Sequence, residues 1–157
     1  MSEFRKQAER LCQVLEELVR LYQFRDRDTD CCAELSISQC YALQTVQRLG
    51  PISMSGLARE LFLEVSSVTR IVDDLVAKRL VERENDPGDR RVCLVRIGSR
   101  GESLAGRIHE ALVDEQARVL KEVPPESREA VIEAMFRFLQ IFKERQGCIS
   151  LKEKGCG

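Results

Sequence analysis

The sequence predicts a mainly α-helical protein with one small β-hairpin, and three observations favour this fold class. Apolar residues recur every three or four positions near both ends of the chain, which is the period of an amphipathic helix. Trp is absent and aromatic residues make up 5 % of the chain, as suits an aliphatic helical core. The stretch NDPGDRRVCLV, Asn85 to Val95, joins a tight turn to an alternating apolar run, which is typical of a hairpin.

The overall composition indicates a folded, soluble chain. Its 157 residues suit a single domain, with 43 % apolar and 32 % charged residues. No apolar run approaches the roughly 18 residues of a membrane span. The N-terminus shows no signal-peptide core, so we expect a cytoplasmic protein. The seven cysteines are an odd number, and we expect reduced thiols rather than a disulfide framework.

Charge is distributed unevenly, although the net charge is only −1. From Arg48 to Arg100, ten Lys and Arg residues oppose eight Asp and Glu residues, which leaves a local balance of +2. Any basic surface must therefore come from the arrangement of side chains rather than from an excess of positive charge.

The N-terminal part predicts two helices. The first is expected over residues 2–24 and ends at the charged residues 25–28. Its apolar stripe has spacings of 4, 3, 4, 3 and 4 residues and consists of Phe4, Ala8, Leu11, Leu15, Leu18 and Tyr22. The second helix would be capped by Ser36 or Ser38 and stop at Gly50-Pro51.

The central part predicts a helix-turn-helix followed by the hairpin. Ser53 is a candidate cap for a short helix over residues 54–61, and after a break Ser66 or its neighbour would cap a second helix. The second helix carries apolar residues at helical spacing, namely Val68, Ile71, Val72, Leu75 and Val76. Strands at residues 80–83 and 92–97 complete a winged helix over residues 36–98.

Two long helices are expected after the hairpin. The first runs from Ser99, as its cap, to about Leu120, and Glu102 would complete a capping box. Pro124-Pro125 ends it. The last helix is expected over residues 126–146, and its apolar face consists of Val131, Met135, Phe138 and Phe142. The tail at residues 147–157 has a weak structural signal.

The second helix of the central motif has the side chains of a nucleic-acid reader. Short hydroxyls and a forked guanidinium suit phosphates and base edges in the major groove. The residues concerned are Ser66, Ser67, Thr69 and Arg70. Ser55, in the preceding helix, is a further candidate contact. The alternative role for the serines is helix capping.

The hairpin turn carries two adjacent arginines that its geometry does not require. Pro87 and Gly88 suffice for the turn. Arg90 and Arg91 are therefore expected to reach a narrow minor groove beside the helix, where the negative potential is stronger. Asp89 would pair with an arginine and aim it. The alternative for Arg91 is a solvated face of the hairpin.

The order of these elements and two segments resemble the multiple-antibiotic-resistance regulator (MarR) family. The segments LARELFLEVSSVTRIVDDLVAKRLVER and DPGDRRVCLVRIGSRG are similar to the family's reader helix and wing. The resemblance implies that residues 1–157 form one regulator, a homodimeric repressor or activator on pseudo-palindromic double-stranded DNA. It also implies dimerisation through residues 2–30 and 99–146, and a small effector in the crevice between the DNA-binding and dimer parts.

Three cysteines near the start of the second helix raise the alternative of a thiol-based effector site. Cys31, Cys32 and Cys40 lie within ten residues, and thiolates favour Zn, Cu(I) or a trivalent metalloid. His109 is a candidate fourth ligand, although an exposed or capping histidine is the simpler interpretation. The cluster could also respond to an oxidant, or its members could be small buried apolar residues.

Cys12 has a position similar to the reactive thiol of the family's organic-peroxide-sensing branch. That branch supports its thiol with tyrosines, whereas this chain has Glu16 and Asp26 in the corresponding places. A neighbouring carboxylate raises the pKa of a thiol, so a core-filling role is favoured over a redox role. Cys93 is expected in the core, and Cys148 and Cys156 flank a polar tail.

Two other function classes fit the sequence less well. An enzyme is disfavoured because the chain has one His, no Gly-rich phosphate loop and no recognisable pair of nucleophile and base. A winged helix that binds only proteins is disfavoured because such modules usually lose the wing arginines and the polar reader face. If the cysteines are structural, the expected effector is a small organic ligand in the crevice.

Overall fold

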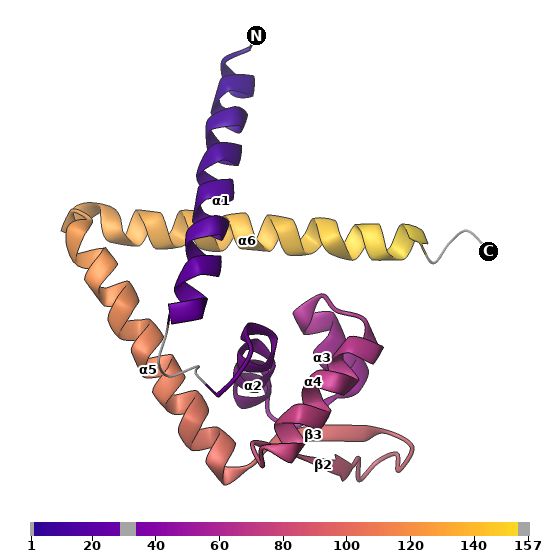
Figure 1. Cartoon of the computed structure of the whole chain (residues 1–157). Coiled ribbons are helices and arrows are strands. Elements are labelled where there is room, and N and C mark those ends of the chain that lie inside the picture. Colours follow the sequence, from indigo (N-terminus) through magenta and orange to yellow (C-terminus); the bar gives the residue numbers. More distant parts are fainter. Residues whose placement is uncertain (1, 29–33, 154–157) are drawn as a thin grey trace. The chain divides into compact units, whose positions relative to one another are not determined.

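The computed structural model describes residues 2–28 and 34–153, with side chains described at residues 2–22 and 34–145 (Figure 1). The elements in this part are α1 (Glu3–Asp28), α2 (Ile37–Leu49), β1 (Ile52–Ser53), α3 (Met54–Leu61), α4 (Val65–Ala77), β2 (Val81–Asn85), β3 (Cys93–Ile97), α5 (Ser99–Glu122) and α6 (Pro125–Glu153). The chain divides into two compact units, Met1–Ala111 and Leu112–Gly157. The predicted fold class, mainly helical with a small β-hairpin, is confirmed.

Helices α2, α3 and α4 and the strands share one aliphatic core within the first unit. α2 packs against α3, α4 and β3. The largest fully buried side chains are Leu43, Val46, Leu57, Val68, Val72, Leu75, Leu80, Val81, Val95 and Ile108. Full burial of such a side chain contributes roughly 1.5–3 kcal/mol relative to exposure. This core fixes one face of α4 inward and leaves the opposite face to solvent.

Local sequence signals set the ends of α2 and α3 as predicted. Ser36 caps α2, because its Oγ accepts the backbone N–H of Gln39 at 3.3 Å and Gln39 Oε1 accepts the backbone N–H of Ser36 at 3.2 Å. Gly50 ends α2 with a φ of 75°, a conformation that favours glycine. Ser53 Oγ accepts the backbone N–H of Gly56 at 3.1 Å, and α3 begins at Met54.

The turn between α3 and α4 differs from the prediction in its cap. Phe62 has a left-handed backbone with a φ of 55°, and 66 % of its side chain is exposed. Glu64 is the N-cap of α4 and makes no side-chain capping hydrogen bond. The prediction that Ser66 or its neighbour caps this helix is therefore wrong. Ser66 and Ser67 lie inside the first turn of α4, and both are exposed.

The hairpin belongs to a three-stranded antiparallel sheet with the order β1-β3-β2. β2 and β3 pair from Val81 with Ile97 to Asn85 with Cys93. β1 was not predicted, and it pairs Ile52 with Val95 and Ser53 with Leu94. Two residues are too few to show a strand's alternation, and the partner strand lies far along the chain. The sequence therefore held no local signal for β1.

The beginning of α5 packs closely against the backbone that follows α4. The carbonyl of Gly98 accepts the backbone N–H of Glu102 at 2.8 Å, and Ser99 is the first helical residue rather than the predicted cap. Gly101 is buried, and a Cβ placed on it would lie 1.9 Å from the carbonyl oxygen of Leu80. Only glycine permits this approach of a helix to a neighbouring backbone.

The first and last helices are longer than predicted. α1 continues through residues 25–28, and α6 continues through residues 147–153, which belong to the tail whose sequence has a weak structural signal. Most of these added residues are charged or aliphatic and are tolerated in a helix. The predicted break at Pro124-Pro125 is confirmed, and Pro125 occupies the first position of α6, where its missing N–H costs nothing.

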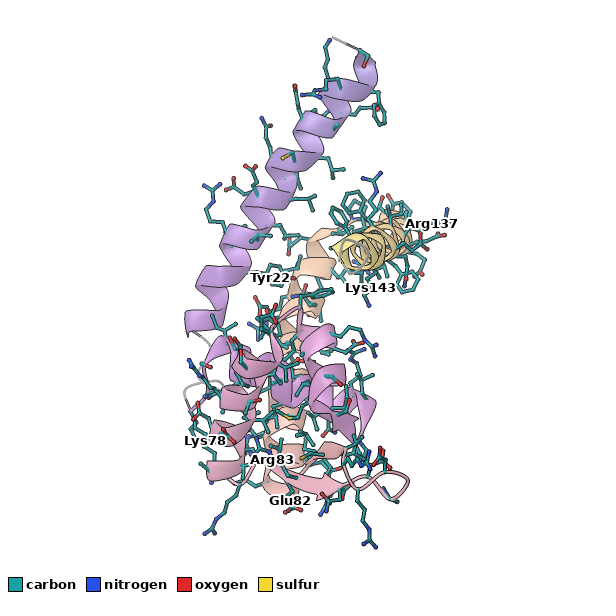
Figure 2. All side chains as sticks on the ribbon, turned by 90° about the vertical axis from the view of Figure 1, so that its right-hand side faces the viewer. Tyr22, Lys78, Glu82, Arg83, Arg137 and Lys143 are labelled. Atoms are coloured by element: carbon teal, nitrogen blue, oxygen red, sulfur yellow. The ribbon has the colours of Figure 1, made fainter. Side chains whose placement is uncertain are left out.

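Both α1 and α6 present apolar side chains to solvent within the single chain. On α1 the exposed ones are Phe4, Leu11, Val14, Val19 and Leu21, and on α6 they are Val131, Ile132, Met135, Phe136, Leu139, Ile141 and Phe142. Arg137 projects from α6 in Figure 2 and pairs with Glu133 at 2.6 Å. Across residues 2–28 and 34–153, no helix combines the length and apolar character needed to cross a bilayer.

Candidate nucleic-acid interface

The outward face of α4 carries the predicted polar side chains. Ser66, Ser67 and Arg70 are exposed, and within the described part of the chain their side chains form no hydrogen bond or ion pair. Thr69 differs, because its Oγ1 donates to the carbonyl of Val65 at 2.8 Å. Its hydroxyl hydrogen is thus occupied inside the helix, and Thr69 is better suited to accept than to donate a hydrogen bond. Ser66, Ser67 and Arg70 keep their donors available.

The predicted contact on α3 is placed less favourably. Ser55 is exposed, but its Oγ lies 3.2 Å from the Oγ of Ser53, the cap of the same helix. This arrangement ties Ser55 to the local geometry of the helix start. Its hydroxyl can still reach a phosphate, since one hydrogen bond does not saturate a hydroxyl group.

The tip of the wing presents two guanidinium groups. Arg90 and Arg91 are exposed, and neither forms an ion pair with another described residue. Asp89 was expected to pair with an arginine side chain, but its Oδ1 accepts the backbone N–H of Arg91 at 3.0 Å. Gly88 donates its backbone N–H to Asp86 Oδ1 at 2.7 Å. The two aspartates thus shape the turn and leave both guanidinium groups unpaired.

Four of the nine basic residues between Arg48 and Arg96 are engaged inside the protein. Arg83 on β2 pairs with Asp73 on α4 at 2.7 Å, and Arg96 on β3 pairs with Glu84 at 3.1 Å and also with Glu82. Figure 2 labels Arg83, Glu82 and Lys78 in this part of the protein. The other two engaged residues are Arg48, which pairs with Glu60, and Lys78, which binds Gln39 and Glu34. The Arg83–Asp73 pair also joins the hairpin to α4.

Five basic residues of the same stretch remain without a side-chain partner among the described residues, and we call them the unpaired arginines: Arg59, Arg70, Arg79, Arg90 and Arg91. All five are exposed. An unpaired guanidinium can bind a phosphate or a base edge without first breaking an internal ion pair. Sequence reasoning missed Arg59 and Arg79, because nothing local shows which arginines the folded chain neutralises.

The thiols occupy separate environments. Cys12 is exposed and its thiol lies 3.4 Å from Glu16 Oε1, to which it donates a hydrogen bond. This hydrogen bond and the charge of Glu16 raise the pKa of Cys12, as the sequence suggested. Cys40 is buried, and its Sγ accepts a hydrogen bond from Gln44 Nε2 at 3.3 Å. Cys93, expected in the core, is half-buried.

The proposed metal or effector cluster is only partly described. Cys31, Cys32 and Cys156 lie outside the described residues, and His109 is exposed on α5. Within the described part, no group of three or more His, Cys, Asp or Glu side chains is arranged to hold a metal ion. A thiophilic ion at Cys31, Cys32, Cys40 and His109 stays a prediction from the sequence.

The environment of Cys12 predicts slow thiol chemistry at neutral pH. Because the pKa is raised, the reactive thiolate forms only at high pH. Replacing Glu16 with Gln should remove the charge and increase the rate of alkylation several-fold at pH 7–8, as measured by peptide mass spectrometry of Cys12. A Cys12→Ser chain, which cannot be alkylated at this position, serves as the control that identifies the mass signal of the alkylated Cys12 peptide. Equal rates in the native and Glu16→Gln chains would show that Glu16 does not control this thiol.

Known proteins share both the sequence pattern and the fold. Residues 34–92 match the model of the MarR family. The uncharacterised HTH-type transcriptional regulator YxaD of Bacillus subtilis is 27 % identical over 128 residues, which cover 82 % of this chain and 90 % of YxaD. A MarR family protein from Bacillus stearothermophilus superimposes with a TM-score of 0.79 at 22 % identity and covers 91 % of this chain and 99 % of its own.

A further solved structure is FabT from Streptococcus pneumoniae in complex with DNA. It has a TM-score of 0.66 and 18 % identity, and the match covers 90 % of this chain and 99 % of FabT. These two structures show the shared fold, and the family match covers α2 through the wing turn, where Arg70, Arg90 and Arg91 lie. The chain therefore belongs to the MarR family of DNA-binding transcriptional regulators.

Proposed function

We propose that the protein acts as a homodimeric repressor on a pseudo-palindromic operator. In this proposal, α4 enters the major groove with Ser66, Ser67 and Arg70, and the wing places Arg90 and Arg91 in the adjacent minor groove. A dimer on promoter DNA would block access of the polymerase, which is the reason for proposing repression. The observation that carries the proposal is the selective pairing of basic residues, which leaves Arg70 on α4 and Arg90 and Arg91 at the wing tip without a side-chain partner among the described residues.

The apolar surface of α6 supports the homodimer. Met135 is 57 % exposed and Phe136 is 59 % exposed, and they are neighbours of Leu139 and Phe142 on the same helix. Monomeric proteins rarely leave contiguous apolar patches larger than a few hundred Å² in contact with water. A second copy of the chain would bury this surface. Two-fold symmetry would then match two α4 helices to half-sites about 34 Å apart.

Binding to the DNA upstream of the protein's own gene tests the operator proposal. We expect fluorescence anisotropy to show tight binding to this duplex. If the dimer contacts 6–10 phosphates, its affinity should fall by about 10³–10⁵ between 50 and 200 mM salt, because released counterions oppose binding. A duplex of the same composition but scrambled sequence serves as the control. Absence of binding at low salt, or equal affinity for both duplexes, would contradict the proposal.

The dimer is tested on α6 with a matched pair of substitutions. Leu139→Glu places a charge on the exposed apolar surface, and Gln140→Glu adds the same charge one residue later. We expect Leu139→Glu to shift the protein to a monomer in light scattering, because burying an unpaired carboxylate is costly. The Gln140→Glu chain should remain a dimer. A monomeric native chain, or a dimeric Leu139→Glu chain, would count against dimerisation through α6.

A further inference from the structure

A buried glutamine connects the start of α2 to the C-terminal half of α4. Gln39 is 9 % exposed, and its Nε2 donates to Asp74 Oδ2 at 2.9 Å. Its Oε1 accepts from Lys78 Nζ at 3.1 Å and from the backbone N–H of Ser36 at 3.2 Å. The amide group of one side chain therefore joins the cap of α2 to Asp74 of α4 and to Lys78, the C-cap of that helix.

The hydrogen bonds continue from Lys78 to the beginning of α5. Lys78 Nζ also donates to the backbone carbonyl of Glu34. Arg100 donates to the backbone carbonyl of Lys78 at 3.3 Å and pairs with the carboxylate of Glu34 at 3.1 Å. Glu34 and Arg100 are exposed, and Lys78 is half-buried. Asp74 is also exposed, whereas Gln39 is buried, so these hydrogen bonds are shielded from water on the Gln39 side.

The hydrogen bonds of Gln39 to Asp74 and Lys78 fix the rotation of α4. Asp74 lies in α4 and Lys78 is its C-cap, and because they are four residues apart they lie on the same side of the helix, about one turn from each other. One residue along a helix corresponds to about 100° of rotation. A rotation or a slide of α4 against α2 would therefore break one or both hydrogen bonds to Gln39. The apolar core contacts alone are less selective, because they have no direction.

The same rotation determines which side chains α4 presents to DNA. Ser66 and Arg70 lie on the face opposite the buried Val68, Val72 and Leu75. We propose that Gln39 is a positioning residue for DNA recognition. It holds α4, through Asp74 and Lys78, in the rotation that directs Ser66 and Arg70 outward. Gln39 itself does not touch the DNA. The proposal rests on DNA binding through α4.

Three variants test the positioning role. Gln39→Leu keeps the approximate size of the side chain and removes its hydrogen bonds. Gln39→Glu keeps the acceptor for Lys78 but opposes the carboxylate of Asp74. The double variant Gln39→Glu/Asp74→Asn restores a hydrogen bond with donor and acceptor exchanged and leaves the net charge unchanged. The readouts are affinity for the upstream duplex and for a scrambled duplex, the salt dependence of binding, and the thermal midpoint.

We expect Gln39→Leu and Gln39→Glu to weaken binding to the upstream duplex by about tenfold, comparable to the loss of one well-placed base contact. Binding to the scrambled duplex and the salt dependence should stay at the native level, because no phosphate contact is removed. The double variant should recover most of the lost affinity. A residue that only stabilised the fold would change the thermal midpoint and leave the ratio of the two affinities unchanged.

Two results would overturn the proposal. One is a folded Gln39→Leu chain whose ratio of upstream to scrambled affinity equals that of the native chain. The other is a folded double variant that binds no better than Gln39→Glu. If Gln39→Leu does not fold, the comparison of Gln39→Glu with the double variant decides. Failure of the native chain itself to bind the upstream duplex would instead contradict the proposed operator function.

Discussion

Replacing Arg90 with Ala is expected to weaken binding to operator DNA by about 1–3 kcal/mol. Arg90 is exposed at the wing tip, and Asp89 is occupied by the backbone of Arg91, so the guanidinium has no internal partner in the described part of the chain. In a narrow minor groove this charge would face an enhanced negative potential. Loss of one cationic contact should also reduce the slope of log K against log salt by about 1, as measured by fluorescence anisotropy.

The same hairpin supplies a matched control for this experiment. Arg96 lies on β3 and is neutralised by Glu82 and Glu84. Arg96→Ala removes the same charge from the chain, but it removes an internal ion pair rather than a free cation. We expect a change in affinity well below that of Arg90→Ala and an unchanged salt slope. Equal losses for both variants would show that the wing acts through its total charge and not through the position of Arg90.

Replacing Gly101 with Ala should destabilise the protein by about 3 kcal/mol or more. The added Cβ would lie 1.9 Å from the carbonyl oxygen and 2.8 Å from the carbonyl carbon of Leu80. Both atoms belong to the backbone, so no side-chain rotation can relieve the overlap. The start of α5 would have to move away from the segment between α4 and β2. Urea denaturation followed by circular dichroism measures the free energy of unfolding.

Gly106 provides the control on the same helix. A Cβ placed there meets no atom within 4 Å, so Gly106→Ala should stabilise α5 by about 0.5–1 kcal/mol. Opposite signs for the two substitutions would show that the close approach at Gly101, and not helix propensity, sets the result. A Gly101→Ala chain as stable as the native chain would mean that α5 is not held against Leu80.

The sequence predicted those features of the fold that depend on nearby residues. The caps at Ser36 and Ser53 and the short helix Met54–Leu61 are set by hydrogen bonds over three residues, and a local pattern is sufficient to find them. Strand β1 depends on pairing with β3, which is distant along the chain, and it was missed. The predicted cap at Ser66 failed because Glu64, an extended residue without a capping bond, precedes α4 instead.

The candidate site could be predicted only in part for the same reason. Residue type and position identified Ser66, Arg70, Arg90 and Arg91 as candidates, and the structure finds them exposed. Whether an arginine is available to bind DNA depends on acidic partners that lie far from it along the chain, such as Asp73 for Arg83. The buried role of Gln39 was also not evident from the sequence, because Asp74 and Lys78 lie 35 and 39 residues further along the chain, in another helix and at its C-cap.

The short span of β1 bears on how the wing tip would meet DNA in the proposed complex. β1 pairs only with Leu94 and Val95, so β3 has neighbours on both sides at those residues alone. Further out, β2 and β3 are joined only by the Asn85–Cys93 pair and the hydrogen bond from the Asp86 N–H to the Val92 carbonyl, and this two-stranded end leads into the turn carrying Arg90 and Arg91. Such a ribbon bends and twists more easily than a wider sheet. The wing is therefore anchored at its base and more flexible at its tip. This flexibility would let Arg90 and Arg91 adapt to minor grooves of different width.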